Sequence, residues 1–121
     1  MKNEERIKCK NPVLQPAFDY IFEKKGEDLS QKHIAEICHI STSYFSRIFP
    51  KEVGESYSGF ISRLNVQRSK HLLEDTNWTI VHISEELGFN DVGYYIRTFK
   101  KYENVTPAVY RKFFMESRSR N

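Results

Sequence analysis

The chain has 121 residues, 39% of them hydrophobic, and a formal net charge of +3. It is therefore long enough for one folded domain with its own core, but too weakly basic for charge alone to identify a nucleic-acid partner. No apolar run approaches the ~20 residues that cross a bilayer, and Cys9 and Cys38 follow no secretory signal, so we expect a cytoplasmic protein with free thiols and no membrane partner.

The N-terminal part of the chain predicts a polar tail followed by a first helix. Residues 1–10 are dominated by Lys, Glu, Asn and Arg, and we expect a tail or the remnant of a linker. Asn11-Pro12 is a helix-start signal, because proline is tolerated in the first turn of a helix. Apolar residues then recur at helical spacing, and Gly26 is expected to end this helix.

Two serines predict the caps of the next two helices. Ser30 precedes a short apolar segment and Ser41 precedes an amphipathic one, and each offers an oxygen to the free N–H groups of a first turn. His39 lies between them, where we expect a left-handed backbone. Pro50 predicts a kink or an end near Phe49, because proline lacks an N–H and clashes with the preceding turn at a cost of ~3 kcal/mol.

A long helix is expected to connect the two halves of the chain. Gly54 ends the first half, and the helix should run from Ser56 or Tyr57 to Glu74. At ~1.5 Å per residue, about 18 residues span roughly 27 Å. Thr79 is then expected to open a fifth helix.

The second half predicts two more helices after that one. Gly88 makes a turn, and Asn90 or Asp91 caps the sixth helix. Asn104 lies where a left-handed end is expected, since asparagine commonly replaces glycine there. Thr106-Pro107 is a cap followed by a proline suited to the first helical position of a last helix. No segment predicts a strand.

The two halves repeat one another. Ile34 returns as Ile83, an offset of 49 residues, and this offset also pairs Ser41 with Asn90. Later positions follow an offset of 50, so one extra residue is expected in the second copy just after the turn; the pairs with this offset include Tyr44 with Tyr94 and Arg47 with Arg97. Each copy has a short apolar helix, a turn, a cap and an amphipathic helix. That layout is a helix-turn-helix, whose second helix enters the major groove of DNA.

Several segments carry a resemblance to a known family. In the second half they are Ile83-Ser84-Glu85, Gly88-Phe89-Asn90-Asp91, Arg97-Thr98-Phe99-Lys100-Lys101 and Val105-Thr106-Pro107. Over residues 11–114 the chain resembles the DNA-binding domain of the AraC/XylS transcription regulators. The resemblance implies double-stranded promoter DNA as the partner, with a role as a transcription activator or other regulator in bacteria. It further implies RNA polymerase as a partner, and the chain is expected either to be a whole single-domain regulator or to be joined to a sensing or dimerisation domain outside this chain.

We therefore expect an all-α, homeodomain-like fold of about seven helices, in which two helix-turn-helix subdomains are joined by a long central helix. The expected division is a tail or linker remnant at 1–10, a first subdomain at 11–55, a linker helix at 56–75, a second subdomain at 76–116 and a tail at 117–121.

The exposed faces of the third and sixth helices are the predicted DNA-contacting surfaces. Residues three and four apart share a helix face, which predicts the following base contacts: Ser43, Ser46, Arg47, Val92, Gly93, Ile96 and Arg97. Polar and basic neighbours are predicted to contact the DNA backbone: Ser41, Thr42, Tyr44, Lys51, Asn90, Lys100, Lys101 and Arg111. Arg47 and Arg97 are the foremost candidates for direct readout, because arginine binds guanine through two hydrogen bonds.

Each of these assignments has a structural alternative. The two arginines are each expected to bind a base or to pair with an acidic neighbour such as Glu52 or Glu85. Val92 and Ile96 either contact thymine methyl groups or pack against the protein. Ser41 and Asn90 are caps first and phosphate contacts second.

Other chemistries find little support in the sequence. The four histidines have no zinc-ligand spacing, there is no Gly-rich phosphate loop, and Cys38 is expected in the core. We therefore predict no enzyme activity, no metal and no cofactor. The competing hypothesis for function is a helical protein-interaction module.

Overall fold

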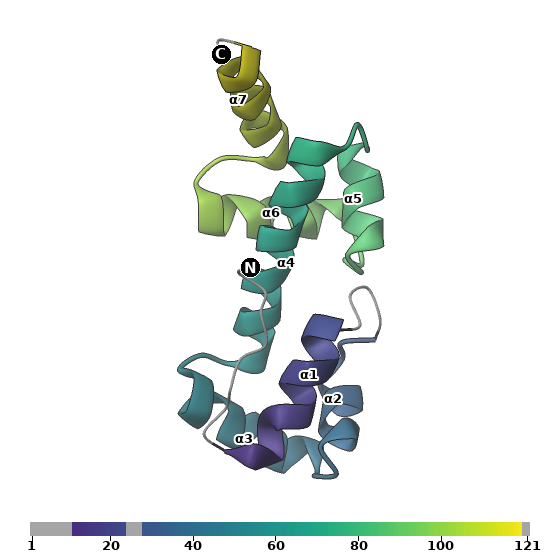
Figure 1. The fold of residues 1–121 in the computed structure, drawn as a ribbon, viewed down its shortest axis with the longest axis vertical. Coiled ribbons are helices and arrows are strands. Elements are labelled where there is room, and N and C mark those ends of the chain that lie inside the picture. The colour runs from purple at the N-terminus through teal and green to yellow at the C-terminus, as the bar shows by residue number, and fades with distance from the viewer. Residues whose placement is uncertain (1–10, 24–27, 120–121) are drawn as a thin grey trace. The chain divides into compact units, whose positions relative to one another are not determined.

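The computed structural model describes residues 11–23 and 28–119, and these residues form helices and turns without a strand (Figure 1). This confirms the all-α prediction. The chain divides into two compact units, Met1–Ile61 and Ser62–Asn121. The division falls inside the fourth helix, so both units share the predicted linker helix. The expected tail at 1–10 and the helix end at Gly26 lie outside the described residues.

The first unit begins with a short 3-10 turn, Pro12–Leu14, that leads into α1, Gln15–Glu23. The N–H of Val13 donates to Asn11 Oδ1 at 3.0 Å, which confirms the predicted start. Helix α2 is Gln31–Ile37 and α3 is Thr42–Val53.

Side-chain caps hold the starts of α2 and α3. Ser30 Oγ accepts the N–H of His33 at 3.3 Å, and Ser41 Oγ accepts the N–H of Tyr44 at 3.0 Å. Both predicted caps are confirmed. Because each cap satisfies an N–H group that has no partner within the helix, local sequence alone suffices to set these two boundaries.

The second unit follows the same plan. Helix α4, Tyr57–Asp75, is followed by α5, Ile80–Glu86, α6, Val92–Glu103, and α7, Pro107–Ser119. Asp91 caps α6 by accepting the N–H of Tyr94 at 2.9 Å, which decides between the two predicted caps. Helix α7 continues to Ser119, so residues 117–119 are helical rather than part of the expected tail.

The turn inside each helix-turn-helix has one hydrogen-bonding pattern. His39 has φ 60°, which confirms the predicted left-handed backbone, and Gly88, the expected turn residue of the second copy, has φ 86°. The N–H of Ile40 donates to Ala35 O at 3.1 Å, and the N–H of Phe89 donates to Ser84 O at 3.0 Å. This is the Schellman ending of a helix in both copies.

The turns also correct the alignment of the two copies. Ile40 and Phe89 are equivalent, and α3 and α6 each start after a capping residue, Ser41 and Asp91 respectively. The offset of 49 therefore persists through Phe89, and Asn90 is the inserted residue. The predicted pairing of Ser41 with Asn90 is wrong. Ser41 accepts the N–H of Tyr44, and the residue that accepts the equivalent N–H of Tyr94 is Asp91.

Helices α3 and α6 also end alike, and this corrects the expected end of α3 near Phe49. Gly54 has φ 92° and Asn104 has φ 69°, and their N–H groups donate to Pro50 O and Lys100 O, each at 2.8 Å. Helix α3 does not end near Phe49 but continues to Val53. A single missing N–H leaves the later hydrogen bonds of the helix intact, so proline is accommodated near the C-terminal end.

Aromatic side chains form the core of the first unit. Phe49 is fully buried, with its ring centroid 5.9 Å from Phe18, 5.3 Å from Tyr57 and 5.5 Å from Phe60. The Tyr57 hydroxyl donates to Leu29 O at 2.7 Å, which attaches the start of α4 to the segment before α2. These contacts hold α3 by its buried side.

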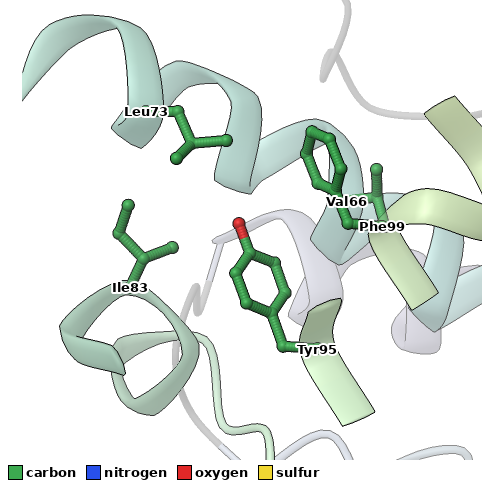
Figure 2. Close-up of a cluster of buried hydrophobic side chains, with 5 residues drawn as sticks. All are labelled: Val66, Leu73, Ile83, Tyr95 and Phe99. Carbon is green, nitrogen blue, oxygen red and sulfur yellow. The ribbon is translucent and has the colours of Figure 1, made fainter. Parts of the chain in front are cut away.

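The core of the second unit is a cluster of five buried side chains from α4, α5 and α6 (Figure 2): Val66, Leu73, Ile83, Tyr95 and Phe99. Both α6 members have 0% of their surface exposed. Burying such a side chain contributes about 1.5–3 kcal/mol, so one side of α6 is committed to the core and the opposite side is left exposed.

Tyr95 carries a buried hydroxyl that has no hydrogen-bond partner among the described residues. Burial raises its pKa to about 12, although the neighbouring Ser69 side chain acts in the lowering direction. We expect Tyr95→Phe to keep the stability at pH 7 or to raise it by up to about 1 kcal/mol, because an unsatisfied polar group is removed. Since the unfolded tyrosine ionises at a lower pH than the folded one, the wild type should lose stability as pH rises above about 10, and the gap to the variant should widen.

Thermal unfolding of both proteins at pH 7 and pH 11 measures this effect. A Tyr95→Phe protein that is less stable than the wild type by more than about 1 kcal/mol at pH 7 would show that the hydroxyl makes a favourable hydrogen bond.

Candidate nucleic-acid interface

Helix α3 presents a polar face to solvent. Ser43, Ser46 and Arg47 are exposed, whereas Phe45 and Phe49 are fully buried on the opposite side. The predicted base-contacting residues of the first unit therefore lie on one accessible surface. The Ser46 hydroxyl donates to Ser43 O at 3.1 Å, so its oxygen keeps acceptor capacity while its proton is used within the helix.

The start of α3 adds three exposed residues that were predicted to contact the DNA backbone: Ser41, Thr42 and Tyr44. The Ser41 oxygen is occupied as a cap, as expected for its primary role. Helix N-termini also present backbone N–H groups that suit phosphate oxygens.

Arg47 extends over its neighbour Tyr44, with the guanidinium carbon 5.6 Å from the ring centroid. Within the described part of the chain it forms no ion pair, so the alternative of a bond to Glu52 is not seen. A cation above an aromatic ring keeps its N–H groups available at the ring edge. Arg47 is thus held near the helix without using up its hydrogen-bond donors.

Helix α6 presents a different surface at the equivalent positions. Val92, Gly93 and Ile96 are partly exposed, and Arg97 and Lys100 are exposed. Opposite them Tyr95, Thr98 and Phe99 are buried. The predicted residues therefore share one face again, but this face offers fewer hydrogen-bonding side chains than that of α3.

Arg97 lies against Gly93. A Cβ atom added to Gly93 would be 3.3 Å from Arg97 Nη1 and 3.0 Å from Asp91 Oδ1. The absence of a side chain at Gly93 thus leaves room for the guanidinium. Among the described residues Arg97 has no carboxylate partner, so pairing with Glu85 is not seen either.

Three lysines and one asparagine of the predicted DNA-backbone set are exposed: Lys51, Lys100, Lys101 and Asn90. Lys101 Nζ lies 5.5 Å from the ring centroid of Tyr102. Tyr94 is also exposed, by 46%, although it was not included in the predicted set. Its equivalence to Tyr44 in the repeat is the signal that would have identified it.

Arg111 differs from the expectation of a phosphate contact. Its guanidinium donates to three backbone carbonyls: Leu73 O at 3.0 Å, Trp78 O at 2.7 Å and Thr76 O at 3.2 Å. These carbonyls lie at the end of α4 and in the turn after it, where backbone acceptors lack helical partners. The structure therefore gives Arg111 a role in the fold, joining α7 to the end of α4.

The neighbour Tyr110 supports this junction, since its hydroxyl donates to the Glu74 carboxylate. Desolvation raises the pKa of Tyr110, and the hydrogen bond to Glu74 raises it further. Lys70 pairs with Glu103 at 3.2 Å and lies over the ring of Tyr110. Side chains of α4, α6 and α7 are thereby linked within the second unit.

Within residues 11–23 and 28–119 no group of three or more His, Cys, Asp or Glu side chains is arranged to hold a metal ion. Of the helices in this part of the chain, none combines the length and the apolar character needed to span a membrane.

Comparison with known proteins extends these observations. A family model described as a helix-turn-helix domain matches residues 34–112. The chain is 30% identical over 117 residues to YfiF of Bacillus subtilis (strain 168), described as an uncharacterised HTH-type transcriptional regulator, and the match covers 97% of this chain and 37% of that protein. The chain spans about a third of the length of several curated relatives that it matches.

Two solved structures are similar as well. The C-terminal domain of AraT, a response regulator from Geobacillus stearothermophilus, matches with a TM-score of 0.78 and 29% identity, covering 85% of this chain and 86% of that one. The DNA-binding domain of AdpA, solved in complex with a target DNA, matches with a TM-score of 0.82 and covers 92% of this chain and all of that one. Because the sequence identity to the AdpA domain is 19%, this match shows a similar fold and nothing more.

Proposed function

This chain belongs to the AraC-type helix-turn-helix family, and we propose that it is the sequence-specific DNA-binding domain of a bacterial transcription regulator. In this proposal α3 and α6 each enter a major groove of promoter DNA, as the second helix of a helix-turn-helix does. The observation that carries the proposal is the pair of exposed arginines at equivalent positions, Arg47 and Arg97. Neither is neutralised by a carboxylate of the described residues.

The rest of each surface suits the DNA backbone. Exposed lysines attract phosphates without regard to sequence, and exposed hydroxyls near the start of α3 are suited to hydrogen bonds with phosphate oxygens. Two recognition helices in one chain would allow a single copy to contact two successive major-groove segments, which lie ~34–36 Å apart along the duplex. Such a role is regulatory rather than enzymatic, and it belongs in the bacterial cytoplasm at the nucleoid.

We further propose that this domain acts together with other protein surfaces. A sensing or dimerisation domain is one expected partner, because the chain spans about a third of the length of its curated relatives. RNA polymerase is the other, as the resemblance to the AraC/XylS regulators implies. Helix α7 supplies exposed apolar surface for such a contact, with Phe113 57% and Met115 46% exposed. The same surface favours the second candidate function, a helical protein-interaction module.

Selection of bound sites from a random double-stranded DNA pool tests the proposal. We expect enrichment of a specific motif, retention of the selected site against competitor DNA, and affinity that falls linearly in a plot of log K against log salt. A pool that stays random after repeated selection would overturn the proposal and would favour the protein-interaction module.

A further inference from the structure

The exposed faces of α3 and α6 differ in chemistry at two equivalent positions. On α6 these are Val92 and Ile96, and on α3 they are Thr42 and Ser46. Residues four apart lie on the same face of a helix, so each pair forms one flank of its recognition surface. The flank of α3 carries two hydroxyl groups, and the flank of α6 carries only methyl and methylene groups.

The apolar pair of α6 is not part of the described core. The buried cluster of the second unit already contains Tyr95 and Phe99 from this helix. Eight partly buried apolar side chains of the described residues pack against that cluster: Leu72, Trp78, Ile80, Leu87, Phe89, Tyr102, Val105 and Tyr110. Val92 and Ile96 are not among these side chains, and both keep part of their surface exposed.

Arg97 restricts what this surface can recognise. Its guanidinium lies beside Gly93, where a side chain would crowd it, and arginine can only donate hydrogen bonds. Lys100 likewise only donates. Neither the arginine, the lysine nor the apolar pair offers an acceptor to the amino groups of adenine or cytosine, which are the major-groove donors of those bases.

We propose that α6 recognises thymine methyl groups through Val92 and Ile96 next to a guanine bound by Arg97, whereas the Thr42 and Ser46 flank of α3 recognises bases through hydrogen bonds. This inference rests on the proposed DNA-binding function. It names the chemistry that each recognition helix selects: apolar contact with the C5-methyl group for the second unit, and for the first, hydrogen bonds to the Thr42 hydroxyl and to the Ser46 oxygen, whose proton is used within the helix.

The test replaces thymidine in the DNA by deoxyuridine. Its uracil base lacks the C5-methyl group and pairs with adenine in the same way. Single thymines of the selected site are changed one at a time, and the affinity of the wild-type chain is measured for each duplex. We expect about fourfold weaker binding per methyl group removed from the segment contacted by α6, from the ~0.8 kcal/mol of a buried CH₂ group. Thymines contacted by α3 should show little change.

Two variants assign the segments, and two more assign the effect. Arg97→Ala and Arg47→Ala should each relax a different base pair, which identifies the segment of each helix. Ile96→Ser should bind thymine and uracil duplexes alike at the affected position. Val109→Ser is the matched control, because Val109 is an exposed valine of α7 (38% exposed) outside the proposed surface and should retain the uracil effect.

The outcomes separate the proposed DNA-binding function from the proposed recognition of thymine methyl groups. A pool without enrichment overturns DNA recognition itself, and this inference with it. A selected site that tolerates uracil throughout the α6 segment leaves the proposed function standing and overturns the inference, as does an equal uracil effect in both segments. Because the central measurement uses the wild-type chain, it does not depend on the folding of any variant.

Discussion

Replacing Arg111 by alanine is expected to lower the free energy of unfolding by about 2–4 kcal/mol, because three backbone carbonyls lose a charged donor and at least part of that loss is not repaid by water. The guanidinium joins Leu73, Thr76 and Trp78 to α7 at 2.7–3.2 Å. Urea unfolding followed by circular dichroism measures the change. Arg111→Lys should recover little of it, since one ammonium group cannot reproduce the fork of donors.

Lys112→Ala is the control for the Arg111 experiment, because it removes a neighbouring exposed charge from the same helix. It should leave stability within about 0.5 kcal/mol of the wild type. An Arg111→Ala protein with wild-type stability but a weaker salt dependence of DNA binding would contradict the structural role of Arg111. It would instead support the predicted phosphate contact.

Replacing Arg47 or Arg97 by alanine is expected to weaken binding to the selected site by about 1–3 kcal/mol each and to relax preference at one base pair. Both residues are exposed, and neither has a carboxylate partner in the described residues, so stability should change little. Titration of each variant against the selected site and its single-base variants measures both effects.

Arg118→Ala serves as the control for the two arginines. It removes an exposed arginine near the end of α7, where the guanidinium carbon lies 5.6 Å from the Phe114 ring centroid, and it should preserve the base preferences. Should Arg47→Ala and Arg97→Ala bind the selected site and random DNA as the wild type does, direct readout by these arginines is wrong.

The two recognition helices have the same length and the same left-handed ending, yet they carry different chemistry. Pro50 occupies the position of Lys100, so the first helix lacks a cation that the second presents. Hydroxyls on α3 correspond to apolar residues on α6. We therefore expect the first unit to contribute less to the phosphate-dependent part of binding, and the two units to differ in base preference.

Much of the fold was predictable because its boundaries are set by short-range interactions. Ser30, Ser41 and Thr79 each accept an N–H three residues ahead, and His39 and Asn104 each adopt the expected positive φ. Caps and turns depend on a few neighbouring residues, so their residue types are visible in one sequence. The exposed faces of α3 and α6 followed in turn from helical periodicity.

The errors occurred where a wider context decided the outcome. Pro50 predicts a kink or an end near Phe49, and the second of these is wrong because the helix continues to Val53. The sequence pairs Ser41 with Asn90, whereas the caps pair Ser41 with Asp91 and leave Asn90 as the extra residue just after the turn, where one is expected. Sequence similarity does not reveal which N–H group a side chain accepts.

The sequence by itself determined the order of helices, the two turns, the repeat and the family, because each depends on local hydrogen bonding or on a periodic apolar pattern. Only the tertiary structure decided the role of Arg111, the burial of the Tyr95 hydroxyl and the position of Arg97 beside Gly93. The physical reason is that these features depend on groups brought together by folding. Whether a cation meets a carbonyl, a carboxylate or water cannot be inferred from its own neighbours in the chain.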